Sequence, residues 1–124
     1  MRIEFTADTA TFDEIGEAFV SGLAIGEGVE TYLMFLSSGG EGDDDCGVYL
    51  EYNDKVNAGY DLISACRLCR GRVEVDLSGT LGDLEDVDGF DVTLQVDDPT
   101  FQSFADGLVK VFRGDASSLL ISAQ

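Results

Sequence analysis

Residues 89–114 change their hydrophobic period half-way along, and this change constrains the fold more than any other feature of the sequence. Residues 90–97 alternate between apolar and polar side chains, which is the period-two pattern of a half-buried strand. The apolar positions are Phe90, Val92, Leu94 and Val96. Asp98 can cap a helix, and Pro99 suits the first turn because the N–H that proline lacks has no helical partner there. The sequence therefore predicts a strand followed directly by a helix over about 99–113.

The predicted helix over 99–113 is amphipathic, with an apolar stripe at helical spacing. The stripe consists of Phe101, Phe104, Leu108, Val111 and Phe112. Arg113 suits the negative C-terminal end of the helix dipole, and Gly114 can end the helix. We expect the stripe to cover the apolar face of the preceding strand, so that the two elements form the core together.

Short alternating runs in the rest of the chain predict several more strands. These predicted strands cover residues 2–6, 17–25, 30–36, 48–52, 56–60 and 70–77. Turn residues at 26–28 and 53–55 predict two hairpins. Residues 8–14 are mostly polar and are predicted to be a connection, while the pattern of residues 62–69 is ambiguous.

Two further segments complete the predicted architecture. Thr80 is expected to open a short second helix near 81–87, with Asp83 three residues later as a weak capping box. The apolar ending at 118–122 forms a last strand or packs beneath the long helix. Strands joined by hairpins, with helices late in the chain, predict a single α+β domain over residues 1–124. Its sheet should be mainly antiparallel, with the long helix on one face.

The chain is strongly acidic, with 25 acidic and 7 basic residues and a formal net charge of −18. Such a surface repels nucleic acid and acidic membranes, and it steers a basic partner toward the protein. A solvated acidic surface, for example in a protein from a salt-rich habitat, is the alternative explanation. Neither interpretation includes direct binding to nucleic acid or to a membrane.

The residues needed for common catalytic mechanisms are scarce. The sequence contains no histidine, which is the commonest general base and a frequent metal ligand. No glycine-rich nucleotide-binding motif is present. Paired carboxylates could still support glycoside hydrolysis, but a chain of 124 residues leaves little room for a substrate cleft. We therefore expect a protein that is not an enzyme and binds no cofactor and no metal.

The three cysteines are expected to be reduced thiols of a cytoplasmic protein. The chain does not start like a signal peptide, and no apolar run approaches the ~18 residues of a membrane helix. Cys66 and Cys69 have C-x-x-C spacing, but on a strand such residues point to opposite faces. A zinc site would need further ligands, and only Cys46 remains. We expect structural thiols.

Two acidic runs and one basic cluster are candidate binding sites. The acidic runs, 43–45 and 83–88, could bind calcium, but neither follows the EF-hand spacing. We expect solvated charge there or, where a run has a role, contact with a basic protein. The basic cluster is Arg67, Arg70 and Arg72. Arg70 and Arg72 should share a strand face and pair with nearby carboxylates, with little effect on stability.

The order of several segments resembles the Immunity protein 10 family of bacterial polymorphic toxin systems. The matching segments are Ala18–Leu23, Tyr32–Ser37 with the acidic loop after it, Gly47–Asn53, Ala58–Tyr60, and the strand before Phe101, Leu108, Val111 and Phe112. The resemblance implies a small cytoplasmic α+β protein that binds and neutralises a cognate toxin. It implies no catalytic residues.

The sequence thus favours an acidic, non-enzymatic immunity protein whose partner is a cognate toxin domain, for example a basic nuclease-type toxin. The expected contacts lie in the acidic loop and on the strand after it. They are Glu41, Asp43, Asp44, Asp45, Tyr49, Glu51 and Asn53. Tyr49 and Glu51 should lie on the face opposite Val48, Leu50 and Tyr52. The alternatives are another acidic interaction module, such as a nucleic-acid mimic or an assembly subunit, and an unrecognised ligand-binding domain or enzyme.

Overall fold

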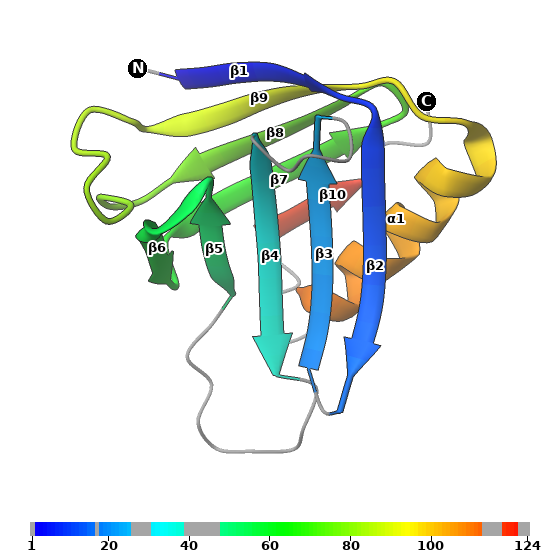
Figure 1. Cartoon of the computed structure of the whole chain (residues 1–124), viewed down its shortest axis with the longest axis horizontal. Helices are drawn as coiled ribbons and strands as arrows, with labels where there is room; N and C mark the ends of the chain where they lie inside the picture. The colour runs from blue at the N-terminus through cyan, green and yellow to red at the C-terminus, as the bar shows by residue number, and fades with distance from the viewer. Residues whose placement is uncertain (1, 17, 26–30, 39–47, 113–117, 122–124) are drawn as a thin grey trace.

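The structure is a computed structural model that describes residues 2–16, 18–25, 31–38, 48–112 and 118–121. Within these residues ten strands form two sheets, and one helix packs against them (Figure 1). The predicted α+β class is confirmed, although the strands form two sheets where the sequence suggested one.

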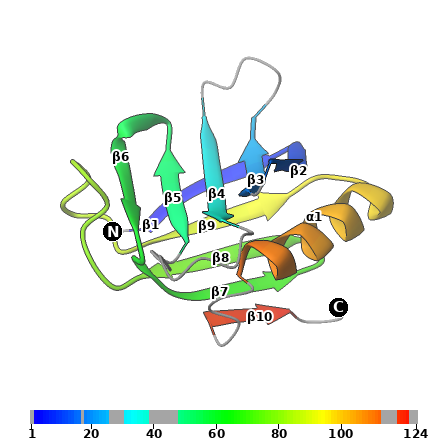
Figure 2. The ribbon, with the colours of Figure 1, turned by 90° about the horizontal axis from the view of Figure 1, so that it is seen from below.

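The strands of the two sheets run across one another (Figures 1 and 2). Sheet 1 has the order β1 (Arg2–Ala7), β9 (Gly89–Leu94), β8 (Arg72–Leu77), β7 (Ile63–Cys69), β10 (Leu119–Ile121). Sheet 2 has the order β2 (Thr9–Ile15), β3 (Ala18–Ala24), β4 (Tyr32–Ser38), β5 (Tyr49–Tyr52), β6 (Asp54–Tyr60). Neighbouring strands of sheet 2 are antiparallel, whereas β1 is parallel to β9 and β10 is parallel to β7.

The single helix of the described residues, α1, spans Asp98–Val111. Asp97 caps it, because its side chain accepts a hydrogen bond of 2.9 Å from the backbone N–H of Thr100. Pro99 lies in the first turn, where proline is tolerated. The predicted helix is confirmed, with the cap one residue earlier than expected. The helix ends at Val111 with Phe112 as its C-cap, two residues before the predicted end at 113. Arg113 and Gly114 themselves lie outside the described residues.

The helix packs mainly against β2 and β3 of sheet 2, and not over β9 as the sequence suggested. Gly107 permits this close approach, since an added Cβ would lie 2.4 Å from the Phe12 ring on β2. Phe112 contacts Phe35 on β4, with 6.2 Å between the ring centroids. The helix stripe and the apolar face of β9 nevertheless share one core, which both sheets and the helix enclose (Figure 2).

The core draws its largest side chains from both sheets, from the helix with its C-cap, and from the loop before β9. The largest fully buried ones are Phe35, Phe90, Phe104, Phe112, Leu23, Leu33, Leu50, Leu68, Leu81, Leu108, Val73 and Val75. The predicted inward face of β9 is confirmed, because Phe90, Val92 and Leu94 are all buried. The removal of this apolar surface from water is the main favourable contribution to folding.

The chain crosses from sheet 1 to sheet 2 at Asp8, between β1 and β2. The backbone N–H of Asp8 donates to the carbonyl oxygen of Ala24 at 3.2 Å. On the other side, Gln95 N donates to the carbonyl oxygen of Ala7 at 2.9 Å. These bonds hold the crossing against both sheets.

The prediction of a connection over residues 8–14 is wrong. β2 pairs with β3 along its whole length, from Thr9 to Ile15. Of the β2 side chains, only Ala10 and Phe12 pack against the core, so the alternation is weak in the sequence. The segment is a strand because β3 supplies backbone partners and α1 covers Phe12.

The prediction of a short helix near 81–87 is also wrong, because these residues form turns. Gly82 has a φ of +57°, and an added Cβ there would lie 1.9 Å from the carbonyl oxygen of Val56. The loop docks on the edge of β6, where Asp83 N donates to the same oxygen at 3.0 Å. Leu81 and Val87 are buried by this docking, which explains their helix-like spacing.

Two segments that the sequence left open are now assigned. The ambiguous residues 62–69 contain β7, and the apolar ending contains β10, which forms the last strand. No helix within the described ranges is long and apolar enough to span a membrane.

Candidate functional site

The expected partner contacts fall into two groups. Glu41, Asp43, Asp44 and Asp45 lie outside the described residues. The others lie on β5 and in the turn that follows it, and the structure shows how they are arranged.

β5 has the orientation that the sequence predicted. Val48 and Leu50 are buried, with exposed fractions of 5% and 0%. Tyr52 also faces the core, since its ring centroid lies 5.2 Å from that of Phe90 on β9. Alternation along the strand then places Tyr49 and Glu51 on the face turned away from the core.

This outer side of sheet 2 carries a group of aromatic and small apolar side chains around one carboxylate. Strand register places Met34 and Ala58 on either side of Glu51, and Tyr60 opposite Tyr49. We name the group the tyrosine face. It consists of Tyr32, Met34, Tyr49, Glu51, Ala58 and Tyr60. Figure 1 looks onto the outer side of β2–β4, with α1 behind them.

Glu51 is held at the centre of this face by two tyrosine hydroxyls. Tyr49 donates a hydrogen bond of 2.6 Å to Oε1, and Tyr32 on β4 donates a short one to Oε2. Glu51 is only 7% exposed as a result. The structure therefore corrects the picture of Glu51 as a freely exposed acidic contact. Its charge lies beneath the tyrosines.

The same hydrogen bonds raise the pKa of Tyr32 and of Tyr49 to about 12, and burial adds to the effect. Both phenols are therefore neutral donors at physiological pH. The carboxylate of Glu51 therefore accepts hydrogen bonds from two neutral donors, and no described cation pairs with it.

The rings of Tyr49 and Tyr60 form the accessible part of the face. Their centroids lie 5.0 Å apart with an interplanar angle of 55°, which is a favourable tilted arrangement. Tyr60 is 54% exposed. Asp54 and Asp61, at the two ends of β6, are exposed, and so is Asp83 in the loop docked on this strand. An acidic rim thus borders the tyrosines.

Asn53 has a structural role in the turn between β5 and β6. Its φ of +62° is the left-handed conformation, which asparagine tolerates better than most residues. Its side-chain oxygen accepts a hydrogen bond of 2.8 Å from the backbone N–H of Tyr32. Asn53 therefore holds the end of β4 against β5, and this role explains it without a partner.

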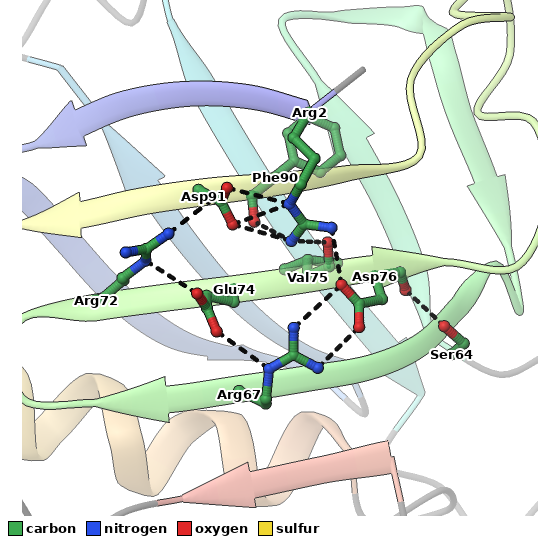
Figure 3. Close-up of polar contacts among 9 residues, drawn as sticks. All are labelled: Arg2, Ser64, Arg67, Arg72, Glu74, Val75, Asp76, Phe90 and Asp91. Atoms are coloured by element: carbon green, nitrogen blue, oxygen red, sulfur yellow. Dashed lines mark hydrogen bonds and ion pairs between the residues drawn. The ribbon is translucent and has the colours of Figure 1, made fainter.

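A closed ring of charges lies on the outer face of sheet 1 (Figure 3). Three arginines alternate with three carboxylates, at N–O distances of 2.7 to 3.6 Å. In order around the ring the members are Arg2, Asp76, Arg67, Glu74, Arg72 and Asp91. They come from β1, β7, β8 and β9, so the ring ties together four strands of the sheet.

The ring lowers the pKa of two of its carboxyl groups. The hydrogen bond from Arg2 lowers the pKa of Asp91, and the hydrogen bond from Arg67 lowers that of Asp76. The side chain of Asp91 is only 15% exposed, the least of the six. Charges this close and partly shielded from water interact more strongly than ordinary surface pairs.

Arg70 does not share a strand face with Arg72, so this prediction is wrong. Arg70 lies in the turn between β7 and β8, outside both strands. Its guanidinium pairs with Asp98 at 2.7 Å and lies 5.1 Å from the centroid of the Phe101 ring. The expected pairing of these arginines with carboxylates is confirmed. The partners lie on β8, β9 and α1.

Most basic side chains of the protein form ion pairs with carboxylates of the same chain. Arg113 lies outside the described residues, which leaves six of the seven basic residues. Five of these six form ion pairs within the chain, and Lys110 does so with Glu14 at 3.0 Å. The large excess of carboxylates therefore determines the potential around the protein.

The cysteines have the arrangement expected of structural thiols. Cys66 is fully buried, and burial raises the pKa of its thiol to about 12. Cys69 lies on the other side of β7, with its sulfur 3.7 Å from the carbonyl oxygen of Arg72. Cys46 lies outside the described residues. No group of three metal-ligating side chains is found in the parts of the chain that the structure describes.

A shallow hollow of ≈ 310 Å³ lies at the β10 edge of sheet 1, between Arg67, Arg72 and Leu120. Both guanidiniums are already bound to Glu74 of the charged ring. The hollow therefore offers no free cationic group to an anion.

No protein-family model matches the chain, and no curated protein matches its sequence.

Proposed function

We propose that this protein binds a basic partner protein through the tyrosine face and the acidic rim beside it, and that it acts without catalysis. In the form suggested by the resemblance to Immunity protein 10, the partner is a cognate toxin domain and binding neutralises it. The observation that carries the proposal is the tyrosine face, where solvent-facing aromatic rings surround a carboxylate held by neutral donors.

The composition of the face supports a protein interface. Tyrosine is enriched at protein interfaces and among their strongest contacts, because a large ring and a hydroxyl are ordered at a small cost in entropy. Three of the four tyrosines of the chain lie on this face. Met34 adds an adaptable apolar side chain opposite Glu51.

The charge of the chain supports a basic partner. The net charge is −18, and five of the described basic residues already pair with carboxylates of the same chain. The field of the excess carboxylates attracts a basic protein and raises its rate of association. The acidic residues of segment 39–47, which precedes β5 in the sequence, would add to this attraction.

The non-enzymatic part of the proposal rests on the absence of histidine from the sequence and on the roles of the described ionisable groups. Tyr32 and Tyr49 donate to Glu51, and the thiol of Cys66 is buried. Each of these groups has a structural explanation.

The test is co-expression of this chain with the toxin domain encoded beside its gene. We expect rescue of growth and a complex that survives size-exclusion chromatography at low salt. A matched control carries Glu4→Gln, an exposed carboxylate on β1 of the other sheet, and should rescue equally. The proposal is overturned when the toxin is active on its own but neither rescue nor a complex is seen.

A further inference from the structure

We infer that the tyrosine face binds one cationic side chain of the partner, an arginine or a lysine, over the rings of Tyr49 and Tyr60 and close to Glu51. The inference deepens the proposed function and rests on it for the identity of the partner. It assigns the chemistry of the central contact, which the overall charge of the protein does not specify.

The first step concerns the charge of Glu51. None of the ion pairs among the described residues includes Glu51. Two tyrosine hydroxyls occupy one acceptor site on each carboxylate oxygen. A carboxylate has about four such sites, so acceptor capacity remains for a further donor. Because Glu51 is 7% exposed, its charge is weakly screened by water and attracts a nearby cation strongly.

The second step concerns the rings. A cation is attracted to the face of an aromatic ring when it lies within ~6 Å of the ring centroid. The Tyr49 and Tyr60 centroids are 5.0 Å apart, so one guanidinium or ammonium group can lie within this distance of both. Ala58 contributes only a methyl group opposite Glu51, so no long side chain of β6 stands directly across from this carboxylate.

The third step is that the chain makes the same contact twice within itself. Arg70 lies 5.1 Å from the centroid of Phe101 and pairs with Asp98. Lys110 lies 5.4 Å from the centroid of Phe12 and pairs with Glu14. Each site combines one cation with one aromatic ring and one carboxylate. The tyrosine face has the rings and the carboxylate, and no described residue of this chain supplies the cation.

A second copy of this chain is a poor source of that cation. Two copies would each bring a net charge of −18, and five of the six described basic residues are already paired. Repulsion between two such surfaces opposes association. The inference therefore commits to a basic partner of different sequence.

The experiment titrates the folded protein with a blocked tripeptide whose central residue is arginine, followed by NMR of the tyrosine ring signals. The control tripeptide carries citrulline, which has the shape of arginine without its charge. We expect saturable shifts of the Tyr49 and Tyr60 rings with arginine and none with citrulline. Tyr60→Leu should weaken binding roughly two- to fivefold, as expected for loss of a cation–π contact at an exposed site. Tyr60→Phe keeps the ring and should bind like the wild type.

Glu51→Gln provides the second arm, since it removes the charge and keeps the shape. We expect weaker binding of the arginine peptide by this variant. Tyr60→Leu changes an exposed ring and leaves both hydrogen bonds to Glu51 in place, so it keeps the inference testable when Glu51→Gln fails to fold.

The outcomes separate this inference from the proposed function. Shifts elsewhere on the protein with none at the two rings overturn the inference, and equal binding of citrulline does the same. When this happens while the toxin is still neutralised, the proposed function stands and only the central contact is wrong. When the arginine peptide binds at the rings but no toxin complex forms, the cation site stands and the proposed function fails.

Discussion

Tyr49 donates a hydrogen bond of 2.6 Å to Glu51, two residues further along the same strand. Residues at this spacing share one face of a sheet, and Tyr32 from the neighbouring strand completes the arrangement from the other side. As a consequence, the carboxylate of Glu51 lies on the outer side of a sheet and is nevertheless buried, with only 7% of the residue exposed. Neutral donors stabilise its charge, and the aromatic rings above it remain available for a partner.

This arrangement predicts a loss of stability at alkaline pH. The pKa of Tyr32 and Tyr49 is about 12 in the folded protein, while in the unfolded chain it takes its ordinary value of 10.0. The stabilisation is fully present below pH ~10 and is lost as the pH rises through ~12, because the unfolded chain then releases protons that the folded protein retains. Urea unfolding across this range should show a falling free energy of unfolding. Glu51→Gln should show a shallower fall, and equal slopes would contradict the assignment.

Asp91→Asn should destabilise the fold, because Asp91 closes the charged ring between Arg2 and Arg72. The substitution leaves two arginines without one of their carboxylates in a partly shielded place, and we expect a loss of about 1–3 kcal/mol in the free energy of unfolding. Chemical denaturation at neutral pH measures this loss in the free energy of unfolding. Glu85→Gln, at an exposed position of the loop before β9, is the control and should change the free energy by less than about 0.5 kcal/mol. Equal effects of the two substitutions would refute a special role for the ring.

The same substitution should lose its effect in acid. The hydrogen bond from Arg2 lowers the pKa of Asp91 in the folded protein below its ordinary value of 3.8. The contribution of this carboxylate is present above pH ~4 and is lost as the pH falls through the folded pKa, because the unfolded chain binds the proton at a higher pH than the folded protein does. The difference in unfolding free energy between wild type and Asp91→Asn should therefore shrink below pH ~4. A difference in unfolding free energy that stays constant down to the acid-unfolding transition would argue against this link to the pKa of Asp91.

Gly107→Ala should destabilise the protein, although alanine is the better helix former by about 1 kcal/mol. The new Cβ would lie 2.4 Å from the Phe12 ring, so α1 or β2 must move. The thermal midpoint should fall for Gly107→Ala. It should rise slightly for the control Ser103→Ala on the exposed side of the same helix. A stabilised Gly107→Ala variant would show that the helix does not pack this closely on β2.

The acidic loop before β5 is predicted to steer the partner. Replacement of Asp43, Asp44 and Asp45 by asparagine should slow association with the proposed basic partner several-fold at low salt and have less effect as salt screens the charges. Stopped-flow measurements at a series of salt concentrations would show this. Charge removal at Glu4 and Asp106, on sheet 1 and α1, is the comparison and should have a smaller effect. An unchanged association rate in the loop variant would exclude the loop from this role.

The candidate site was only partly visible in the sequence. The position of Tyr49 and Glu51 on an outward face followed from alternation along 48–52. The burial of Glu51 did not, because it depends on Tyr32, which lies 19 residues earlier in the chain. Asn53 is a residue type that favours turns, and the structure shows that its role in the turn between β5 and β6 accounts for its presence. Tyr32 and Tyr60 were missed as site residues, although their aromatic character on neighbouring predicted strands could have indicated them.

The sequence by itself determined the elements whose pattern is local. The strand at 89–94 and the helix after it depend on side-chain period and on the cap and proline between them, all within one stretch of chain. The acidic character of the surface also follows from composition alone. These features need no knowledge of distant residues.

Only the tertiary structure decided which faces meet. The choice of sheet 2 as the support for α1, the strand nature of β2 and the parallel pairing of β1 with β9 depend on segments that are far apart in sequence. The same holds for the charged ring, in which Arg2 and Asp91 are separated by 89 positions. Contacts of this range leave no periodic signal in either partner, because each side chain is selected by a neighbour that the fold brings to it.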